Sequence, residues 1–187
     1  MPPPGATVST VTGSMPALHT SSGTTPGDPV GGPVGDPLGT DPLAAAFREI
    51  TDDDVAQVVA LWEACGLTRP WNDPHVDIAD ARRGPTSTVL VLRAPAAQPA
   101  AEAGDVVATV MAGLDGHRGW LYYVAVAPDR QGSGLGRAAV AAGEAWLRAA
   151  GARKVQLMVR STNTQVLGFY ERLGYGDQAT TVLGRWF

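Results

Sequence analysis

Beyond residue 43, the apolar residues follow two spacings that alternate along the chain. Apolar residues at every second position, or in short unbroken runs, predict six β-strands: residues 47–50, 88–93, 106–113, 120–127, 155–159 and 180–187. Apolar residues three and four apart predict four helices: residues 52–65, 75–83, 135–150 and 164–173. The predicted order is therefore β-α-α-β-β-β-α-β-α-β.

The connections between these elements predict how the strands pair. The short link 114–119 makes its flanking strands an antiparallel hairpin. A whole helix separates strand 120–127 from strand 155–159, so these two are predicted to be parallel. Along strand 120–127, alternation predicts that Tyr122 and Tyr123 point to opposite faces. The result is a mixed α/β fold, a twisted sheet with helices on both faces.

The turn after strand 120–127 carries the strongest chemical signal. The strand ends at Pro128, glycines follow at positions 132, 134 and 136, and a helix begins at about Leu135. The first N–H groups of a helix lack intrahelical partners, and the helix dipole adds about half a positive charge there. Glycine has no Cβ, so the backbone can approach an anion closely. This turn therefore predicts a phosphate or pyrophosphate site.

Two common phosphate-binding motifs do not match this turn. The P-loop of nucleotide-binding proteins requires a Gly-Lys pair, and the sequence contains none. The dinucleotide-binding motif requires G-x-G-x-x-G, whereas the glycines here are spaced G-x-G-x-G. Only 27 residues follow Arg160, which stands where that motif places its acidic residue. They are too few for the remaining strands and helices of a dinucleotide-binding fold.

Two motifs resemble the signatures of the GNAT acetyltransferase superfamily. The segment Gln131–Gly136 matches its Q/R-x-x-G-x-G/A motif. Its second signature, N-x-x-A-x-x-x-Y-x-x-x-G-F, is matched, with Val for the small residue and Tyr for Phe, at Asn163, Tyr170 and Gly174-Tyr175. Residues 61–74 are similar to the bacterial YpeA-like branch. The resemblance covers residues 46–187 and implies a GNAT fold with about six to seven strands.

This resemblance implies that the protein moves an acetyl group from acetyl-CoA directly to an amine. In the family, the coenzyme arm lies along the strand before the turn, and a backbone N–H near Val124 would polarise the thioester carbonyl. The residues that the resemblance assigns to acetyl-CoA are Val124, Ala125, Val126, Gln131, Gly132, Ser133, Gly134, Leu135, Gly136, Arg137 and Asn163. Those assigned to the acceptor are Trp71, Asn72, Asp73 and Tyr122. The segment around Trp71 equally fits a structural turn.

The resemblance also implies which residue acts as the general acid, but it does not identify the general base. Tyr170 is the predicted general acid for the departing thiolate, contributing on the order of 10–10³-fold. Tyr170 also fits a core aromatic residue, and Asn163 also fits the N-cap of the last helix. No residue stands out as a general base. Asp115, His117 and Asp73 are candidates, and each also fits a solvated turn.

Composition separates the first 43 residues from the rest. They contain nine of the 15 prolines and eight of the 23 glycines, and they show no hydrophobic periodicity. Segment 1–43 is therefore predicted to be a disordered tail, followed by one domain over residues 44–187. Two interpretations of the tail stay open, a linker or a start codon assigned too early. The tail lacks the basic start and apolar stretch of a signal peptide.

Charge and cysteine content narrow the expected partners. The net charge of −4, without a dense basic cluster, argues against nucleic acid. No run of about 18 apolar residues occurs, so no membrane span is expected. The single cysteine, Cys65, excludes an internal disulfide, fits the cytosol and is interpreted as a core thiol. No metal is expected, and a homodimer is compatible with these features.

Two functional hypotheses follow. The first is a cytoplasmic, acetyl-CoA-dependent N-acetyltransferase that acts on a small amine, a peptide N-terminus or a lysine. The alternative is a catalytically weak acyl-CoA sensor or interaction module on the same fold. The glycine turn and Tyr170 favour the enzyme, whereas the lack of a clear general base keeps the alternative open.

Overall fold

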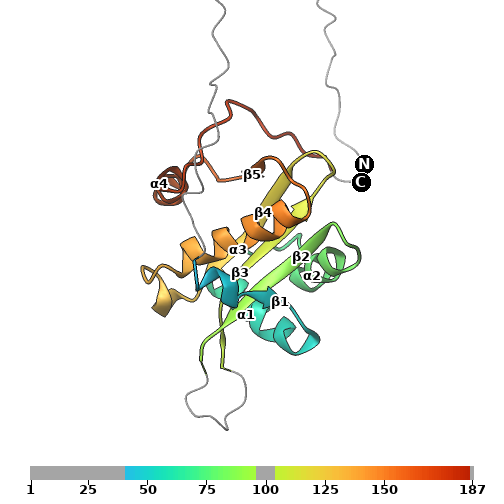
Figure 1. The fold of residues 1–187 in the computed structure, drawn as a ribbon, viewed down its shortest axis with the longest axis vertical. Helices are drawn as coiled ribbons and strands as arrows, with labels where there is room; N and C mark the ends of the chain where they lie inside the picture. The colour runs from blue at the N-terminus through green and yellow to red at the C-terminus, as the bar shows by residue number, and fades with distance from the viewer. Residues whose placement is uncertain (1–40, 96–103, 186–187) are drawn as a thin grey trace, which may run out of the picture. The chain divides into compact units, whose positions relative to one another are not determined.

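A computed structural model describes residues 41–95 and 104–185, and five strands in these ranges form one mixed sheet (Figure 1). In spatial order the strands are β1 (Arg48–Glu49), β2 (Ser87–Arg93), β3 (Val106–Leu114), β4 (Gly119–Val126) and β5 (Val155–Leu157). Strands β1 to β4 pair in antiparallel fashion, whereas β4 and β5 are parallel. The predicted hairpin and the predicted parallel pair are both confirmed.

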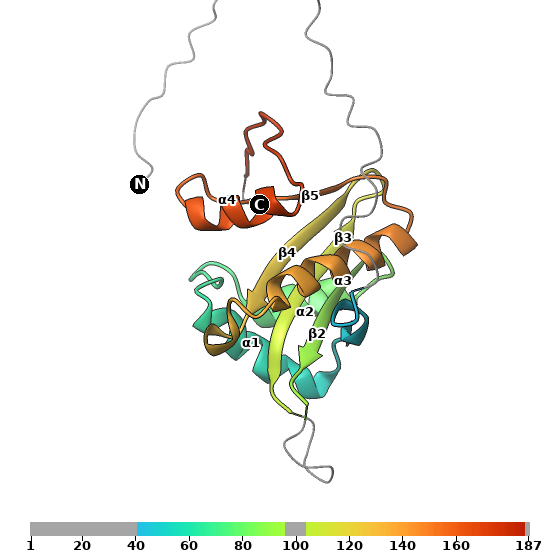
Figure 2. The ribbon, with the colours of Figure 1, turned by 60° about the vertical axis from the view of Figure 1, so that its left-hand side comes forward.

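The described residues form four helices: α1 (Val55–Ala64), α2 (Pro74–Arg82), α3 (Leu135–Ala149) and α4 (Thr164–Arg172). Helices α1 and α2 lie on one face and α3 on the other (Figure 2). Trp62 and Ile78 fill the core under α1 and α2, and Leu147 fills the core under α3. The predicted arrangement, with helices on both faces, is confirmed.

Local side-chain chemistry explains where several elements begin and end. A short 3-10 turn, η2 (Asp52–Asp54), starts α1, and the Asp54 carboxylate accepts hydrogen bonds from the N–H and hydroxyl of Thr51 at 2.7 and 2.8 Å. The Asn163 carbonyl oxygen accepts from the Val166 N–H at 3.3 Å, which makes Asn163 the predicted N-cap of α4. Gly151, at φ +92°, follows α3 as predicted.

A buried carboxylate ties the start of the domain to the sheet. Asp54 is fully buried, and two arginines bind it: Arg48 through Nη1 and Nη2 at 2.7 and 2.9 Å, and Arg93 through Nε at 2.8 Å. Burial on its own would raise the pKa of Asp54, but the hydrogen bonds from Arg48, Thr51 and Arg93 outweigh it and lower that pKa. Asp54 therefore holds β1, η2 and β2 together as an ion.

The predicted last strand is wrong within its described part. Residues 176–185 form neither helix nor strand, and Val182 and Leu183 are 67% and 89% exposed. Residues 186–187 lie outside the described ranges. An alternating pattern needs a partner strand as well, and β5, at the edge of the sheet, is only three residues long. As far as the chain is described, the sheet therefore has five strands rather than six to seven.

The predicted tail 1–43 lies outside the described residues except for positions 41–43, so its boundary stays a prediction. The folded unit that contains the described residues continues from there with a short 3-10 turn, η1 (Ala44–Ala46). In the described ranges, no helix has the length and apolar character needed to cross a bilayer.

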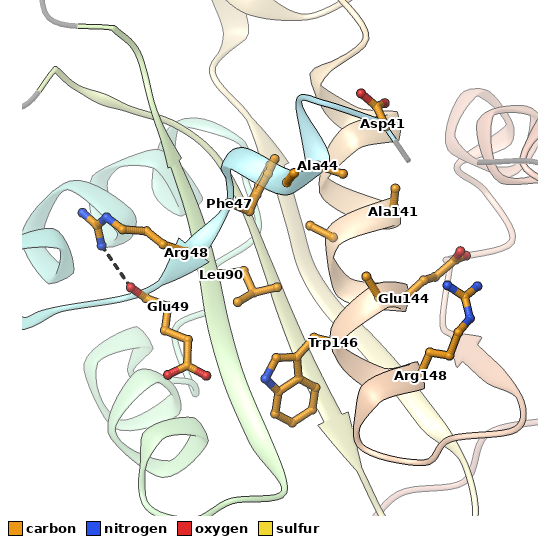
Figure 3. A pocket seen from close by; sticks show the side chains of 13 residues that line it. Asp41, Ala44, Phe47, Arg48, Glu49, Leu90, Ala141, Glu144, Trp146 and Arg148 are labelled. Atoms are coloured by element: carbon orange, nitrogen blue, oxygen red, sulfur yellow. Dashed lines mark hydrogen bonds between the residues drawn. The ribbon is translucent and has the colours of Figure 1, made fainter. Parts of the chain in front are cut away.

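A hollow of about 520 Å³ lies between η1, β1, β2 and α3 (Figure 3). Phe47, Leu90 and Trp146 contribute apolar surface to it, and Glu144 and Arg148 lie along its α3 side. None of the residues predicted to bind acetyl-CoA or the acceptor lines this hollow. The hollow lies at the β1 edge of the sheet, opposite to β5, and is separate from the candidate site.

Candidate active site

Strands β4 and β5 are paired over only three residues and then part. Their parallel register runs from Gly119 with Val155 to Leu121 with Leu157, while β4 continues to Val126. The Ala127 N–H donates to Val107 of β3 at 2.9 Å. Because successive peptide groups of a strand point to opposite edges, those of Val124 and Val126 face away from β3. Within the described ranges, no strand therefore pairs with the β5 side of β4 from Tyr122 to Val126.

A β-bulge interrupts β4 at the start of this unpaired edge. The register between β3 and β4 shifts between Thr109 and Met111, and Tyr123 adopts the left-handed region at φ +47°. That conformation costs a non-glycine residue on the order of 1–3 kcal/mol. Bulges of this kind redirect side chains and end strand pairing, often beside active sites. The backbone of β4 therefore changes direction at Tyr123, directly before Val124.

Three contacts hold Tyr123 in this conformation. Its ring stacks on that of Trp62 at a centroid distance of 3.9 Å. Trp62 Nε1 donates to Thr109 Oγ1 at 2.9 Å, and the Thr109 hydroxyl donates to the Tyr123 carbonyl at 3.1 Å. The Tyr123 hydroxyl donates to Asp77 Oδ2 at 2.5 Å. Contacts from α1, β3 and α2 thus offset the strain of the bulge.

The bulge also overturns the prediction that Tyr122 and Tyr123 point to opposite faces. Tyr122 lies directly opposite Met111, which belongs to the core under α1 and α2, so Tyr122 lies on that face. Tyr123 packs into the same core against Trp62. Strict alternation fails because the bulge adds one residue to β4. Tyr122 is 36% exposed on this face.

The glycine turn has the free N–H groups that the sequence predicts. After β4 come the single turn η3 (Pro128–Arg130) and two glycines in the left-handed region, Gly132 at φ +79° and Gly134 at φ +90°. No described residue supplies a hydrogen-bond acceptor to the N–H groups of residues 131–137. The first helical bond of α3 runs from Ala138 to the Gly134 carbonyl. The α3 N-terminus is therefore a suitable seat for an anion.

Other side chains of the turn are engaged in shaping it. The Ser133 hydroxyl donates to the Arg130 carbonyl at 2.5 Å. Gln131 Nε2 donates to the Val126 carbonyl at 3.4 Å, which links the turn to the open edge of β4. Arg137 Nη2 lies 3.6 Å from Asp41 Oδ2. These residues therefore offer their backbone N–H groups rather than unengaged side chains, and the half-buried Leu135 packs beneath the turn.

Cys65 and Ala125 complete the surroundings of the β4 edge. The Cys65 thiol donates to the Val126 carbonyl at 3.3 Å, and burial raises the pKa of this thiol. Cys65 packs on the core under α1, as predicted, but is only partly buried. Ala125 is buried and pairs with Thr109 of β3, so its backbone faces away from the opening.

Tyr170 lies on α4, and α4 packs beside the turn. A Cβ on Gly136 would lie 3.5 Å from the Phe169 ring, in ordinary van der Waals contact, so α3 passes close to α4 at this point. Tyr170 is 9% exposed, and burial raises its pKa to about 12. Its hydroxyl has no partner among the described residues, and none of their unpartnered side-chain oxygens is fully buried. The Tyr170 hydroxyl is thus protonated at neutral pH and accessible.

Two of the three candidate general bases, Asp73 and Asp115, have structural roles, and His117 lies beside Asp115 in the hairpin turn with its Nδ1 3.4 Å from Arg118 Nη1. Asp73 accepts from the His75 N–H at 2.8 Å and begins α2 as its N-cap. Asp115 accepts from the N–H groups of His117 and Arg118 and from the indole of Trp120, and these bonds lower its pKa to about 2. A carboxylate with so low a pKa is a weak base. The interpretation of Asp73 and Asp115 as turn residues fits both positions.

The segment expected to face the acceptor lies beside the bulge. Trp71 is 63% exposed, and its neighbour Asn72 donates through Nδ2 to Asp77 Oδ2 at 3.2 Å. The same Asp77 oxygen accepts from Tyr123, so the loop before α2 is joined to β4. Asp77 is not among the candidate site residues named from the sequence, where it stands only as one of several acids near residue 73. Its hydrogen bonds with Tyr123 and Asn72, rather than a sequence motif, place Asp77 on the side of α2 that faces β4.

Comparisons with known proteins agree with this geometry. Residues 55–175 match the family described as "Acetyltransferase (GNAT) family". Proteins named "Acetyltransferase" from Yersinia pestis (strain Pestoides F) and Yersinia pseudotuberculosis are each 41% identical to this chain over 138 residues. The matched region covers 74% of this chain and 92% of each relative.

Solved structures give the same result for the fold. The structure of AAC(6')-Iy in complex with a bisubstrate analogue, CoA-S-monomethyl-acetylneamine, superposes with a TM-score of 0.62 at 15% identity, over 75% of this chain and 97% of that one. A Trypanosoma brucei acetyltransferase gives 0.56 at 24% identity, over 75% and 98%. At these identities the likeness concerns the fold alone.

Proposed function

The chain belongs to the acetyltransferase (GNAT) family and is an acyltransferase, and from this premise we propose that it transfers an acetyl group from acetyl-CoA directly to an amine. The acceptor class is an amine of a small molecule, a peptide or a protein. The observation that carries the proposal is the unpaired edge of β4 leading into a turn with free N–H groups. The alternative of a sensor without turnover is not favoured, because the curated relatives are named as acetyltransferases.

The residues present fit acetyl-CoA. Its diphosphate suits the N–H groups of residues 131–137, because two left-handed glycines and the α3 dipole present them to an anion. Its pantetheine amides suit the peptide groups of Val124 and the N–H of Val126, because the Val126 carbonyl already accepts from Cys65 and Gln131. Asn163 lies at the start of α4. When bound, acetyl-CoA supplies an activated acetyl group.

The chain's own groups then have complementary tasks. The N–H of Val124, next to the bulge, suits the polarisation of a carbonyl oxygen, and the Tyr170 hydroxyl, whose pKa is raised by burial, suits the protonation of a thiolate. Trp71, Asn72, Asp73 and Tyr122 stay proposed for the acceptor side, since the loop before α2 is joined to β4 beside Tyr122. The YpeA-like branch, a homodimer, a cytoplasmic location and the lack of nucleic acid, membrane or metal partners also stay predictions.

Release of coenzyme A thiol from acetyl-CoA tests the proposal. The purified full chain is expected to release thiol in the presence of at least one member of a panel of polyamines, free lysine, aminoglycosides and peptides with free N-termini. A mass increase of one acetyl group on that amine identifies the product. Tight binding of acetyl-CoA without turnover on any amine would instead support the sensor.

Replacing Tyr170 by phenylalanine is expected to lower kcat by about 10- to 100-fold, with little change in the dissociation constant of acetyl-CoA. The substitution keeps the buried ring and removes only the accessible hydroxyl that protonates the thiolate. Steady-state kinetics and calorimetry measure the two constants. Tyr175→Phe is the matched control, because Tyr175 bonds Glu144 rather than solvent. An unchanged kcat in Tyr170→Phe would remove Tyr170 from the acid role.

A further inference from the structure

Asp77 is a carboxylate fixed through one oxygen and free at the other. Its Oδ2 accepts from Tyr123 Oη at 2.5 Å and from Asn72 Nδ2 at 3.2 Å. None of the described residues donates to Oδ1, and no unpartnered side-chain oxygen in those residues is fully buried. Oδ1 is therefore accessible, and the two donors orient it.

The position of Asp77 is set by the bulge of β4. Its partner Tyr123 is the left-handed residue that directly precedes Val124, and Trp62 and Thr109 hold Tyr123 in place. Asp77 thus belongs to the rigid part of the site on the face of α1 and α2. The exposed Trp71 lies in the loop that leads to the same helix.

Other nearby acids are already used by the fold. Asp73 caps α2, and Asp80 forms an ion pair with Arg83 at 2.6 Å. Among the described residues, Tyr123 is the titratable group that contacts Asp77, and Arg69 acts electrostatically on Tyr123. The pKa of Tyr123 is raised by burial and by its bond to Asp77, and Arg69 Nη1 binds the carbonyls of Gly66 and Thr68. Neither Tyr123 nor Arg69 neutralises Oδ1 through a direct ion pair.

We propose that Asp77 binds the acceptor amine as a cation and takes its proton, an inference that rests on the function proposed above. The ammonium gives one proton to Oδ1, and the neutral nitrogen forms a bond to the acetyl carbon as the carbon–sulfur bond breaks. Tyr170 protonates the sulfur and is reprotonated by the second proton lost from nitrogen. The products are an amide and a thiol, and Asp77 passes its proton to water.

The pH dependence of the variant Asp77→Asn tests this assignment. At pH 7 roughly one lysine-type amine in 10³ or fewer is neutral, whereas near pH 10 a large fraction is. Using the alkylamine of the panel that the wild type acetylates fastest, kcat/KM of Asp77→Asn is expected to fall about 100-fold at pH 7. The loss should shrink to less than about fivefold at pH 9.5, because roughly one amine in ten is then already neutral without a base.

A binding measurement provides a readout that does not depend on turnover. Calorimetric titration of the same amine into the protein saturated with coenzyme A is expected to show about tenfold weaker binding in Asp77→Asn. Asp80→Asn is the matched control, since it removes the same charge from the same helix at an exposed ion pair. Asp80→Asn should change neither kcat/KM nor the dissociation constant of the amine by more than about twofold. Thermal unfolding verifies that both variants are folded.

A second variant separates chemistry from structure. Tyr123→Phe keeps the ring on Trp62 and removes one donor to Asp77, so a smaller loss of about 3- to 10-fold is expected. A loss in Asp77→Asn that is equal at pH 7 and pH 9.5, or kcat/KM within twofold of the wild type, would overturn the role of Asp77 alone. A wild type that acetylates no amine would overturn the proposed function and this role together.

Discussion

Replacing Gly134 by valine is expected to weaken the binding of acetyl-CoA by roughly 10²–10³-fold. Gly134 has φ +90°, and a β-branched residue there costs on the order of 1–3 kcal/mol or shifts the backbone. Such a shift misaligns the N–H groups that begin α3, and each hydrogen bond to a charged group contributes about 1.5–3 kcal/mol. Calorimetric titration with acetyl-CoA and with coenzyme A measures the loss.

Gly151 offers a control at the other end of the same helix. It has φ +92°, and, as at Gly134, no atom lies within 4 Å of the position that its Cβ would occupy. Gly151→Val therefore imposes the same backbone strain on α3 away from the turn. Its dissociation constant for acetyl-CoA should stay within about twofold of the wild type. Equal losses in both variants would show that strain in α3, rather than the anion seat, controls binding.

Replacing Asp54 by alanine is expected to lower the free energy of unfolding by about 3–5 kcal/mol. Asp54 is fully buried and ion-paired with both Arg48 and Arg93, so its removal leaves the two guanidinium groups without their shared partner. Denaturant unfolding measures the change. Asp52→Ala is the matched control in the same turn, because its ion pair with Arg82 is exposed and contributes about 0–1 kcal/mol.

The same carboxylate predicts how stability depends on pH. The pKa of Asp54 is lower in the folded than in the unfolded chain. Between these two pKa values the folded state therefore binds fewer protons than the unfolded state. The stability that Asp54 contributes is therefore fully present above about pH 4, the ordinary pKa of an aspartate, and is lost as the pH falls further. The unfolding free energy of Asp54→Asn should vary less than that of the wild type between pH 5 and pH 3.

Helices and turns that depend on residues close together in the sequence can be predicted from the sequence. The helices begin at side-chain caps such as Thr51 and Asn163, and the glycine turn follows from residue spacing alone. The last strand was predicted from alternation, yet a strand also requires a partner, and alternation carries no information about the length of β5. The predicted number of strands is therefore too high, because it includes the strand expected at residues 180–187.

The candidate site could likewise be predicted only in part, because some of its residues depend on contacts that are distant in the sequence. The family motif locates the turn and Tyr170, because both depend on short-range patterns. The bulge at Tyr123 depends on Trp62 and Thr109, which are distant in the sequence, so alternation misplaced Tyr122. Asp77 acquires its partners through the same bulge and has no sequence signature of its own.

The hydrogen-bond chain from Trp62 through Thr109 to Tyr123 has a consequence for biosynthesis. All of its members precede the glycine turn, so every side chain that shapes the kink in β4 has been translated when the ribosome reaches that turn. The half of the site that depends on α1, α2 and β3 thus needs no residue of α3 or α4 for its own contacts. A nascent chain stalled shortly after residue 126 already carries that complete set of partners.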